Sequence, residues 1–146
     1  MQTVYDYLII GAGMTADAAA KSIRESDASA RIGIVGDESQ APYERPPLSK
    51  ALWKDGKSPD EVDLGTVRSG AELHLDRRIE SLDRIARTAI DHPGDVYHYT
   101  RLLLATGATP RQLPFAGNER GSHFRTLHDY MELRRYAVAD ARIAVV

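Results

Sequence analysis

Hydrophobic positions follow two different patterns over the first 35 residues of the chain. The stretch VYDYLII, residues 4–10, is rich in β-branched and aromatic residues and predicts a buried strand. The stretch MTADAAAKSIRES, residues 14–26, instead spaces its apolar residues as on one face of a helix. RIGIV, residues 31–35, predicts a second short strand. Strand–helix–strand units of this kind are nearly always parallel, so we expect an α/β fold.

The middle of the chain predicts a loop followed by antiparallel strands. Residues 36–62 read as loop, with one short helix near 47–53. Three short β-prone pieces follow at 78–82, 86–90 and 95–99, and the sequence DHPGD between the last two is a strong turn signal. We therefore expect a small antiparallel β-meander.

The last third of the chain predicts two further strands and a helix. RLLLATG, residues 101–107, predicts another buried strand, and residues 127–140 have the apolar spacing of a helix. RIAVV, residues 142–146, predicts a new buried strand in which the chain stops, which favours truncation. We then expect one incomplete domain over residues 1–141, with 142–146 as the first strand of another. The alternative is the last strand of a complete domain.

Composition narrows the classes of function. The chain has 146 residues, is 42% hydrophobic and 27% charged, and carries a formal net charge of −2. This balance predicts no nucleic-acid partner and no anionic membrane surface, and no apolar run could span a bilayer. The chain has no cysteine, which excludes a disulfide framework and thiolate metal ligands within it. These features fit a cytoplasmic protein.

A glycine-rich turn joins the first predicted strand to the first predicted helix. GAGMTA, residues 11–16, matches the pattern G-x-G-x-x-G/A. Gly11 permits the tight turn, Gly13 lets the backbone approach a pyrophosphate, and Ala16 is small enough for helix and strand to touch. Phosphates would then lie at the N-terminus of the helix, among unpaired amides and the positive end of its dipole.

An acidic residue follows the second predicted strand, where a dinucleotide site requires one. Asp37 comes just after the strand that ends at Val35 and can accept hydrogen bonds from ribose hydroxyls. An acid at this position argues against a 2′-phosphate, but it does not separate NAD from FAD. The alternative is a packing turn beside an ordinary loop acid; the combination of strand, turn, helix and acid favours a dinucleotide site.

Three stretches of the chain resemble a known family of flavoproteins. YLIIGAGMTA, GIVGDESQAPYERPPLSKALW and RLLLATGATPRQLP occur in this order. Together they resemble the FAD-binding start of the pyridine nucleotide–disulfide oxidoreductase superfamily, and most closely its ferredoxin and rubredoxin reductases, which include apoptosis-inducing factor. The resemblance covers nearly the whole chain. It implies a Rossmann-like FAD/NAD(P)-binding fold, with FAD on this part and NAD(P)H on a second, inserted domain.

The resemblance also implies which residues contact FAD. It assigns the pyrophosphate to the turn backbone, the adenosine ribose to the acidic loop, adenine to the backbone of one strand residue, and further contacts to a second glycine turn and three basic side chains. These residues are Gly11, Ala12, Gly13, Met14, Thr15, Asp37, Glu38, Ile79, Thr106, Gly107, Arg45, Lys50 and Arg125.

Two of the basic residues flank a pair of prolines in YERPPLSK. Arg45 is a planar permanent cation suited to phosphate oxygens. Lys50, our candidate catalytic residue, would lie near the flavin ring and stabilise negative charge as the ring accepts hydride. Pro46 and Pro47 fix φ and would keep this segment rigid. Other basic pairs, at 77–78 and 134–135, read as solvated surface, and the five histidines as loop, strand-edge or surface residues.

The absence of cysteine then bears on the route of the electrons. Disulfide-reducing members of the superfamily carry a redox cysteine pair near the short helix, whereas this chain has PPLSKALW there. The resemblance therefore implies an NAD(P)H-dependent reductase that passes electrons through FAD to an external acceptor, such as a ferredoxin or rubredoxin. The alternative is an isolated FAD- or nucleotide-binding module with no turnover of its own.

Overall fold

The computed structural model describes residues 4–54, 56, 58–112, 114 and 121–145. These residues form two compact units, each made of two stretches of chain. The first unit comprises residues 1–44 and 63–107, and the second comprises 45–62 and 108–146.

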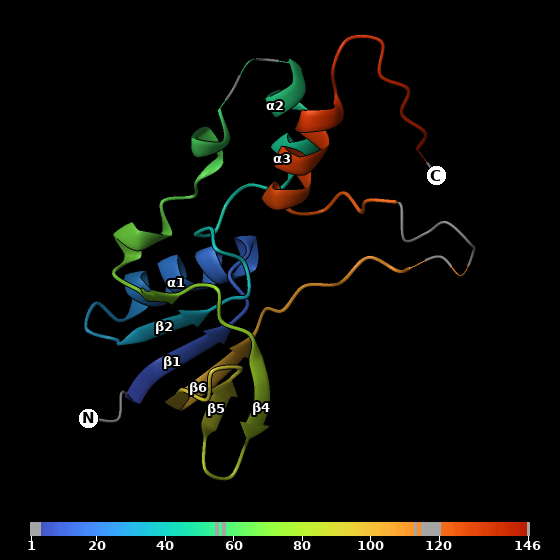
Figure 1. Cartoon of the computed structure of the whole chain (residues 1–146). Helices are drawn as coiled ribbons and strands as arrows, with labels where there is room; N and C mark the ends of the chain where they lie inside the picture. Colours follow the sequence, from blue (N-terminus) through green and yellow to red (C-terminus); the bar gives the residue numbers. More distant parts are fainter. Residues whose placement is uncertain (1–3, 55, 57, 113, 115–120, 146) are drawn as a thin grey trace. The chain divides into compact units, whose positions relative to one another are not determined.

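The first unit is built on a mixed β-sheet (Figure 1). Among the described residues its strand order is β3-β2-β1-β6-β5-β4, with β3, β2, β1 and β6 parallel and β6, β5 and β4 antiparallel. The strands are β1 (Val4–Ile10), β2 (Ile32–Val35), β3 (Glu72–His74), β4 (Ile79–Asp83), β5 (Thr88–Asp91) and β6 (Val96–Leu104). The predicted parallel α/β sheet with a small antiparallel meander is thus confirmed.

Helix α1 (Met14–Ser26) connects β1 to β2 and packs on one face of the parallel strands (Figure 1). Its alanines are small enough to let the helix approach the sheet closely. The cluster on this face consists of Ile9, Ala16, Ala20, Ala30, Ile32, Ile34 and Ala71. The predicted helix and the two flanking strands are confirmed with almost the same bounds.

A second apolar cluster joins the parallel strands to the meander. It consists of Tyr5, Leu8, Ile10, Val35, Ala89, Tyr97 and Tyr99. The Tyr5 ring lies so close to Gly33 that a Cβ there would come within 2.9 Å of it. The core therefore requires glycine in the middle of β2 as well as large side chains around it.

Strand β6 corrects one prediction from the sequence. The pieces 95–99 and 101–107 were expected as separate strands, but they form one strand, Val96–Leu104, that pairs with β1 along most of its length and with β5 through Val96–His98. No glycine or proline lies between them, so nothing in the sequence interrupts the strand. The meander and the parallel sheet consequently share a strand.

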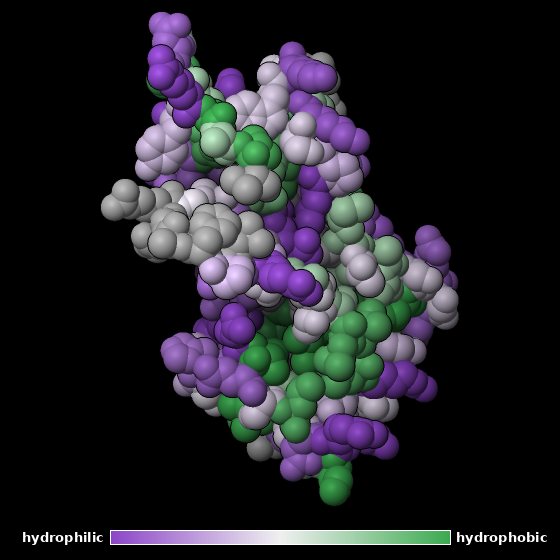
Figure 2. All heavy atoms as spheres, turned by 90° about the vertical axis from the view of Figure 1, so that its right-hand side faces the viewer, coloured by the Kyte–Doolittle hydropathy of each residue, from purple (hydrophilic) through white to green (hydrophobic). Residues whose placement is uncertain are grey.

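The carboxyl half of β6 is less buried than the sequence predicted. Leu103 is 38% exposed and Leu104 is 59% exposed, although both belong to the predicted buried strand. The cluster that α1 covers includes Ile9 of β1 and Ile32 and Ile34 of β2 but neither of these two leucines. Figure 2 shows hydrophobic side chains at the surface of the part of the molecule that holds the sheet.

The second unit contains short helices from both of its chain stretches. The first stretch forms the 3₁₀ helix η1 (Pro46–Ser49), α2 (Ala51–Lys54) and η2 (Pro59–Val62), and the second forms α3 (Leu127–Tyr136). Trp53 lies edge-on to Tyr130, whose hydroxyl donates to the carbonyl of Leu52, so α2 and α3 lie side by side (Figure 1). The predicted short helix is confirmed.

Two predicted elements of this unit differ in the structure. The helix predicted over 127–140 ends at Tyr136, because Ala137 leaves helical geometry and Asp140 has a positive φ of 64°. Residues 142–145 form no strand, and residue 146 lies outside the described residues. A strand needs a neighbour for its backbone hydrogen bonds, and none pairs with this segment among the described residues. The predicted domain boundary after residue 141 remains a prediction.

Candidate dinucleotide-binding site

The glycine turn lies between the carboxyl ends of three parallel strands. The backbone N–H of Gly11 donates to the carbonyl of Val35 at 2.7 Å, and that of Ala105 donates to the carbonyl of Ile10 at 2.7 Å. Gly11 has a φ of 107°, and a Cβ there would lie 2.2 Å from the carbonyl oxygen of Ala105. Position 11 therefore requires glycine both for its backbone conformation and for the close approach of the segment after β6.

The start of α1 offers backbone donors and open space. Gly13 is the N-cap residue, and no side chain caps the helix there. Among the described residues beyond its two chain neighbours, a Cβ built on Gly13 meets no atom within 4 Å, and the side chains of Met14 and Thr15 are exposed. The first amides of a helix have no intrahelical partner, and the positive end of its dipole lies with them. This helix start fits an anionic group such as a pyrophosphate.

One carboxylate lies in the first turn of α1, but its charge is paired. Asp17 is buried, and one of its oxygens accepts from the Thr66 hydroxyl at 2.7 Å. The other accepts from the Lys21 ammonium at 2.9 Å. Asp17 therefore holds α1 to the segment Thr66–Ser69 and contributes little net negative charge to the helix start.

The acidic loop after β2 packs against the glycine turn. Gly36 is buried, and a Cβ on it would lie 2.3 Å from the Cβ of Ala12. Beyond it, the carboxylate of Asp37 is 66% exposed and lies 4.0 Å from the Arg78 guanidinium. Glu38 instead accepts a hydrogen bond from the Tyr43 hydroxyl at 2.5 Å. The two neighbouring acids thus differ: Asp37 projects into solvent, and Glu38 is engaged within its own loop.

The other residues predicted for the first unit lie next to these loops. Ile79 is the first residue of β4 and follows Arg78, which contacts Asp37. Thr106 and Gly107 are exposed, follow β6, and come directly after the residue that packs on Gly11. Gly107 has a φ of 68°, which again favours glycine. The first unit therefore brings its predicted site residues to one edge of the sheet, where ligands of open α/β sheets bind.

The three predicted basic residues belong to the second unit. Arg45 precedes η1, and its guanidinium donates to the carbonyl of Arg125 at 2.9 Å. Lys50 ends η1, its amide donates to the carbonyl of Pro47 at 3.0 Å, and its side chain is exposed. The fold of this unit thus joins Arg45 to Arg125, 80 residues away, and keeps Lys50 at the other end of a rigid turn.

A capping box fixes the backbone at Arg125. The Thr126 side chain accepts from the amide of Asp129 at 3.1 Å, and the Asp129 carboxylate accepts from the amides of Thr126 and Arg125 at 2.7 and 2.9 Å. Burial alone would raise the pKa of Asp129, but these hydrogen bonds hold it below its usual value. The cap therefore holds the carbonyl group to which Arg45 is bonded.

Two polar residues to which the sequence analysis gave no site role make structural contacts. His74, expected in a loop, at a strand edge or on the surface, ends the edge strand β3; its ring is half-buried, and its Nε2 lies 2.7 Å from the hydroxyl of Tyr5, which donates to Glu72 at 2.6 Å. Burial lowers the pKa of His74 and raises the pKa of Tyr5. Arg134 packs its guanidinium over the Trp53 ring at 5.2 Å. The local sequence around a histidine or an arginine does not indicate contacts with residues that are distant along the chain.

Within the described ranges no group of acidic or histidine side chains is arranged to hold a metal ion. Nor is any helix there long and apolar enough to span a membrane. The geometry can instead hold an anionic dinucleotide at the strand ends, with amides for phosphates and a carboxylate for ribose.

Comparison with known proteins agrees with this geometry. The chain is 31% identical over 145 residues to a rubredoxin–NAD(+) reductase and 31% identical over 148 residues to putidaredoxin reductase, both from Pseudomonas putida. Each alignment covers 95% of this chain but only 38% and 35% of the relative, so the chain spans little more than a third of their length.

Solved structures extend the comparison. The fold matches the structure of a covalent putidaredoxin reductase–putidaredoxin complex with a TM-score of 0.80 and 29% identity, over 93% of this chain and 35% of the other. It matches a ferredoxin reductase from Rhodopseudomonas palustris with a TM-score of 0.80 and 34% identity, over 89% and 34%. The pyridine nucleotide-disulphide oxidoreductase family matches residues 5–146. The chain therefore belongs to the pyridine nucleotide-disulphide oxidoreductase family.

Proposed function

We propose that the chain is the FAD-binding portion of an NAD(P)H-dependent flavoprotein reductase. The observation that carries this proposal is the arrangement of the first unit's strand ends. There, an uncapped helix start with open space at Gly13 lies beside an exposed carboxylate, Asp37, in the loop that packs on the same turn. These are the groups that a dinucleotide's pyrophosphate and ribose require.

The chain's own residues would hold the cofactor in distinct ways. The backbone from Gly11 to Thr15 would line the pyrophosphate, with the amides at the start of α1 as donors, and Asp37 would accept from the ribose hydroxyls. Ile79, Thr106 and Gly107 would contribute backbone contacts.

The resemblance assigns Arg45, Arg125 and Lys50 to the same cofactor. A guanidinium such as that of Arg45 suits phosphate oxygens. The carbonyl of Arg125 already orients Arg45. Bound FAD would supply hydride acceptance from a reduced nicotinamide. Lys50 would bind near the ring, where a fixed positive charge favours the reduced, more negative form.

The acceptor is proposed to be an iron–sulfur protein of the ferredoxin or rubredoxin kind. The names of the relatives, rubredoxin–NAD(+) reductase and putidaredoxin reductase, support this class. The chain has no cysteine, so it cannot itself supply a disulfide as the electron outlet. A cytoplasmic location, expected from the sequence, remains a prediction.

Flavin binding tests the proposal directly. The purified chain is dialysed against FAD, the flavin absorption of the protein fraction is measured, and the bound cofactor is released and identified by chromatography. We expect bound FAD in the wild-type chain. A protein that remains colourless after this treatment would overturn the proposal.

A matched variant separates site chemistry from folding. Gly13→Val adds a side chain at a position whose Cβ would meet no described residue within 4 Å beyond its chain neighbours, and the φ of −103° is open to any residue. The variant should fold with unchanged circular dichroism but lose FAD. Because the resemblance assigns NAD(P)H to a second, inserted domain, we expect no ferricyanide reduction with NADH by this chain alone. The same assay on a protein that carries both domains separates a reductase from the alternative, a binding module without turnover.

A further inference from the structure

The acidic loop of the site is held by a short segment that lies between β3 and β4. The amide of Gly36 donates to the carbonyl of His74 at 2.9 Å. The amide of Arg77 donates back to the carbonyl of Gly36 at 2.8 Å, and the amide of Asp76 donates to the carbonyl of Glu38 at 3.1 Å. Asp37 lies between two residues whose carbonyls are both bound, so the place of its carboxylate depends on the backbone of 76–77.

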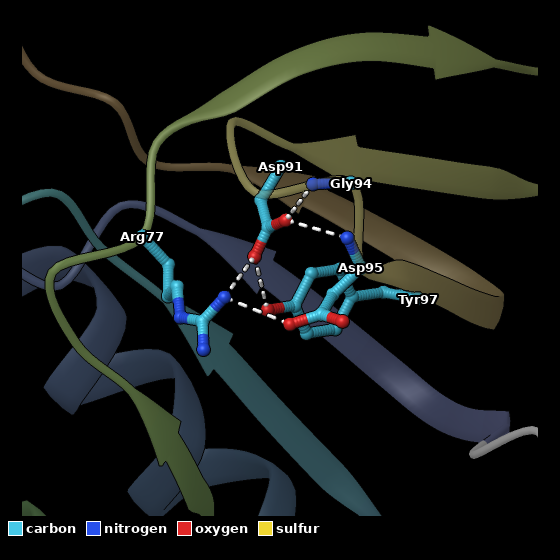
Figure 3. Close-up of polar contacts among 5 residues, drawn as sticks. All are labelled: Arg77, Asp91, Gly94, Asp95 and Tyr97. Carbon is cyan, nitrogen blue, oxygen red and sulfur yellow. Dashed lines mark hydrogen bonds and ion pairs between the residues drawn. The ribbon is translucent and has the colours of Figure 1, made fainter.

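The side chain of Arg77 fixes that backbone to the turn between β5 and β6. Its guanidinium lies 3.3 Å from one Asp91 oxygen and 2.8 Å from an Asp95 oxygen (Figure 3). The Arg77 side chain is 35% exposed, whereas that of Asp91 is completely buried. The sequence analysis placed Arg77 on a solvated surface; this contact, 14 residues away along the chain, corrects that prediction.

Asp91 is a rigid partner because three further hydrogen bonds to its carboxylate come from within its own hairpin. One oxygen accepts from the amides of Gly94 at 3.1 Å and Asp95 at 2.8 Å, and the other accepts from the Tyr97 hydroxyl at 2.8 Å (Figure 3). Burial alone would raise the pKa of Asp91, but the Tyr97 and backbone hydrogen bonds and the Arg77 charge hold it below its usual value. The carboxylate therefore stays charged and presents a fixed acceptor to Arg77.

We propose that Arg77 is a positioning residue for the nucleotide site: Asp91 and Asp95 anchor its side chain, and its main chain sets the place of Asp37. Arg77 itself need not touch the ligand. The inference rests on the proposed function, since it concerns the contact between Asp37 and the ribose of FAD.

The contacts on the two sides of Arg77 support a role beyond stability alone. Its side chain bonds to Asp91 and Asp95 at the β5–β6 turn, whereas its amide bonds to Gly36 at the start of the loop after β2. The residue thus links a rigid hairpin to the ligand-facing loop. Loss of the Arg77 side chain would leave the backbone hydrogen bonds between 76–77 and the loop after β2 in place. It would remove the contacts to Asp91 and Asp95 that fix the position of 76–77.

The experiment measures the dissociation constant of FAD by equilibrium titration of the wild-type chain and of Arg77→Gln. We expect binding to weaken by about threefold to thirtyfold, the size typical of residues that couple to a site without touching the ligand. Arg84→Gln, an exposed arginine in the β4–β5 turn, is the matched control and should bind as wild type does. Asp95→Asn removes the charge of one of the two carboxylates that anchor Arg77, and the Asp95 side chain is 65% exposed. It should shift affinity in the same direction even if Arg77→Gln folds poorly.

A double-mutant cycle separates positioning from general destabilisation. If Arg77 acts through Asp37, Arg77→Gln should weaken FAD binding much less in an Asp37→Ala background than in the wild-type background. Equal fold-changes in both backgrounds would overturn the inference, as would unchanged affinity in Arg77→Gln and Asp95→Asn. Wild-type protein that binds no FAD would overturn the proposed function and the inference with it. Bound FAD with no effect of these variants would overturn the inference alone.

Discussion

At two positions of the site, the close approach of neighbouring segments decides that the residue must be glycine. Gly11 is required because the carbonyl of Ala105 occupies the space of a Cβ, and Gly36 because Ala12 does. The G-x-G-x-x-A pattern predicted the first glycine. It could not predict the second, because Gly36 looks like any loop glycine until the two loops are seen to touch.

The two adjacent acids should make unequal contributions to binding. Asp37→Ala removes an exposed carboxylate, whereas Glu38→Ala removes the partner of the Tyr43 hydroxyl. We expect Asp37→Ala to weaken FAD binding by roughly 1–3 kcal/mol, the cost of leaving ribose hydroxyls without their acceptor. Glu38→Ala should affect chiefly thermal stability.

Isothermal titration of both variants with FAD, beside thermal unfolding, checks this difference. Asp37→Asn is the control, since it keeps an acceptor oxygen and should retain part of the affinity. Equal flavin affinity in the two alanine variants would contradict the assignment of the ribose to Asp37.

At the scale of elements, segments with a continuous periodic pattern that ends at a turn signal were predicted with the right bounds, whereas a very short strand and a strand with two neighbours were not. Strand β1 and helix α1 have the predicted bounds because their patterns are continuous and end at a turn signal. Strand β3 was missed because it has only three residues, Glu72–His74, too few for a periodic signal. Strand β6 was predicted as two strands, although no glycine or proline interrupts it; that a single strand pairs with both β1 and β5 is visible only in the sheet.

Helix α3 should depend on its capping box. Thr126→Ala removes the acceptor for the Asp129 amide, and such a change costs about 1 kcal/mol of stability. Trp53 is the only tryptophan in the chain and packs on Tyr130 of α3, so its fluorescence reports the unfolding of this unit.

Urea unfolding followed by that fluorescence measures the loss. Thr126→Ser keeps the hydroxyl and should remain near the wild-type midpoint. A Thr126→Ala midpoint identical to that of the wild type would show that the box contributes nothing to this helix.

At the scale of the whole molecule, the chain consists of two units whose segments alternate along the sequence. The sheet unit holds the glycine turn, Asp37 and residues 105–107 after β6, and the other unit holds Arg45, Lys50 and Arg125. The sequence predicted all of these residues through the motifs of a family. It did not predict their division between two units, because the chain leaves the sheet unit after Glu44 and returns at Asp63 with no compositional break.

The sheet unit should lose stability in acid before its carboxylates titrate. Burial holds the pKa of His74 below its ordinary value of 6.5. As pH falls through that value, the unfolded chain binds a proton that the folded chain does not, so the free energy of unfolding decreases. Asp91, whose pKa lies below its ordinary value of 3.8, should add a further loss only at more acidic pH.

Urea midpoints followed by circular dichroism between roughly pH 7 and pH 5, where an ordinary histidine titrates, check this expectation. His74→Gln should flatten the slope in this range, because it removes the group whose pKa burial lowers. A wild-type stability that is constant over this range would contradict the assignment.

The sequence by itself determined the strand–helix–strand unit, the glycine turn, the acid after β2, the absence of cysteine from these 146 residues, and the family. The unit, the turn and the motifs of the family each depend on residues close together in the chain, where periodicity and the need for glycine leave a pattern. Only the tertiary structure decided that Gly36 touches Ala12, that β6 is one strand, and that Arg77 is anchored on Asp91. Such contacts join residues distant in sequence, and their free energy comes from burial and pairing that arise only when the sheet has formed.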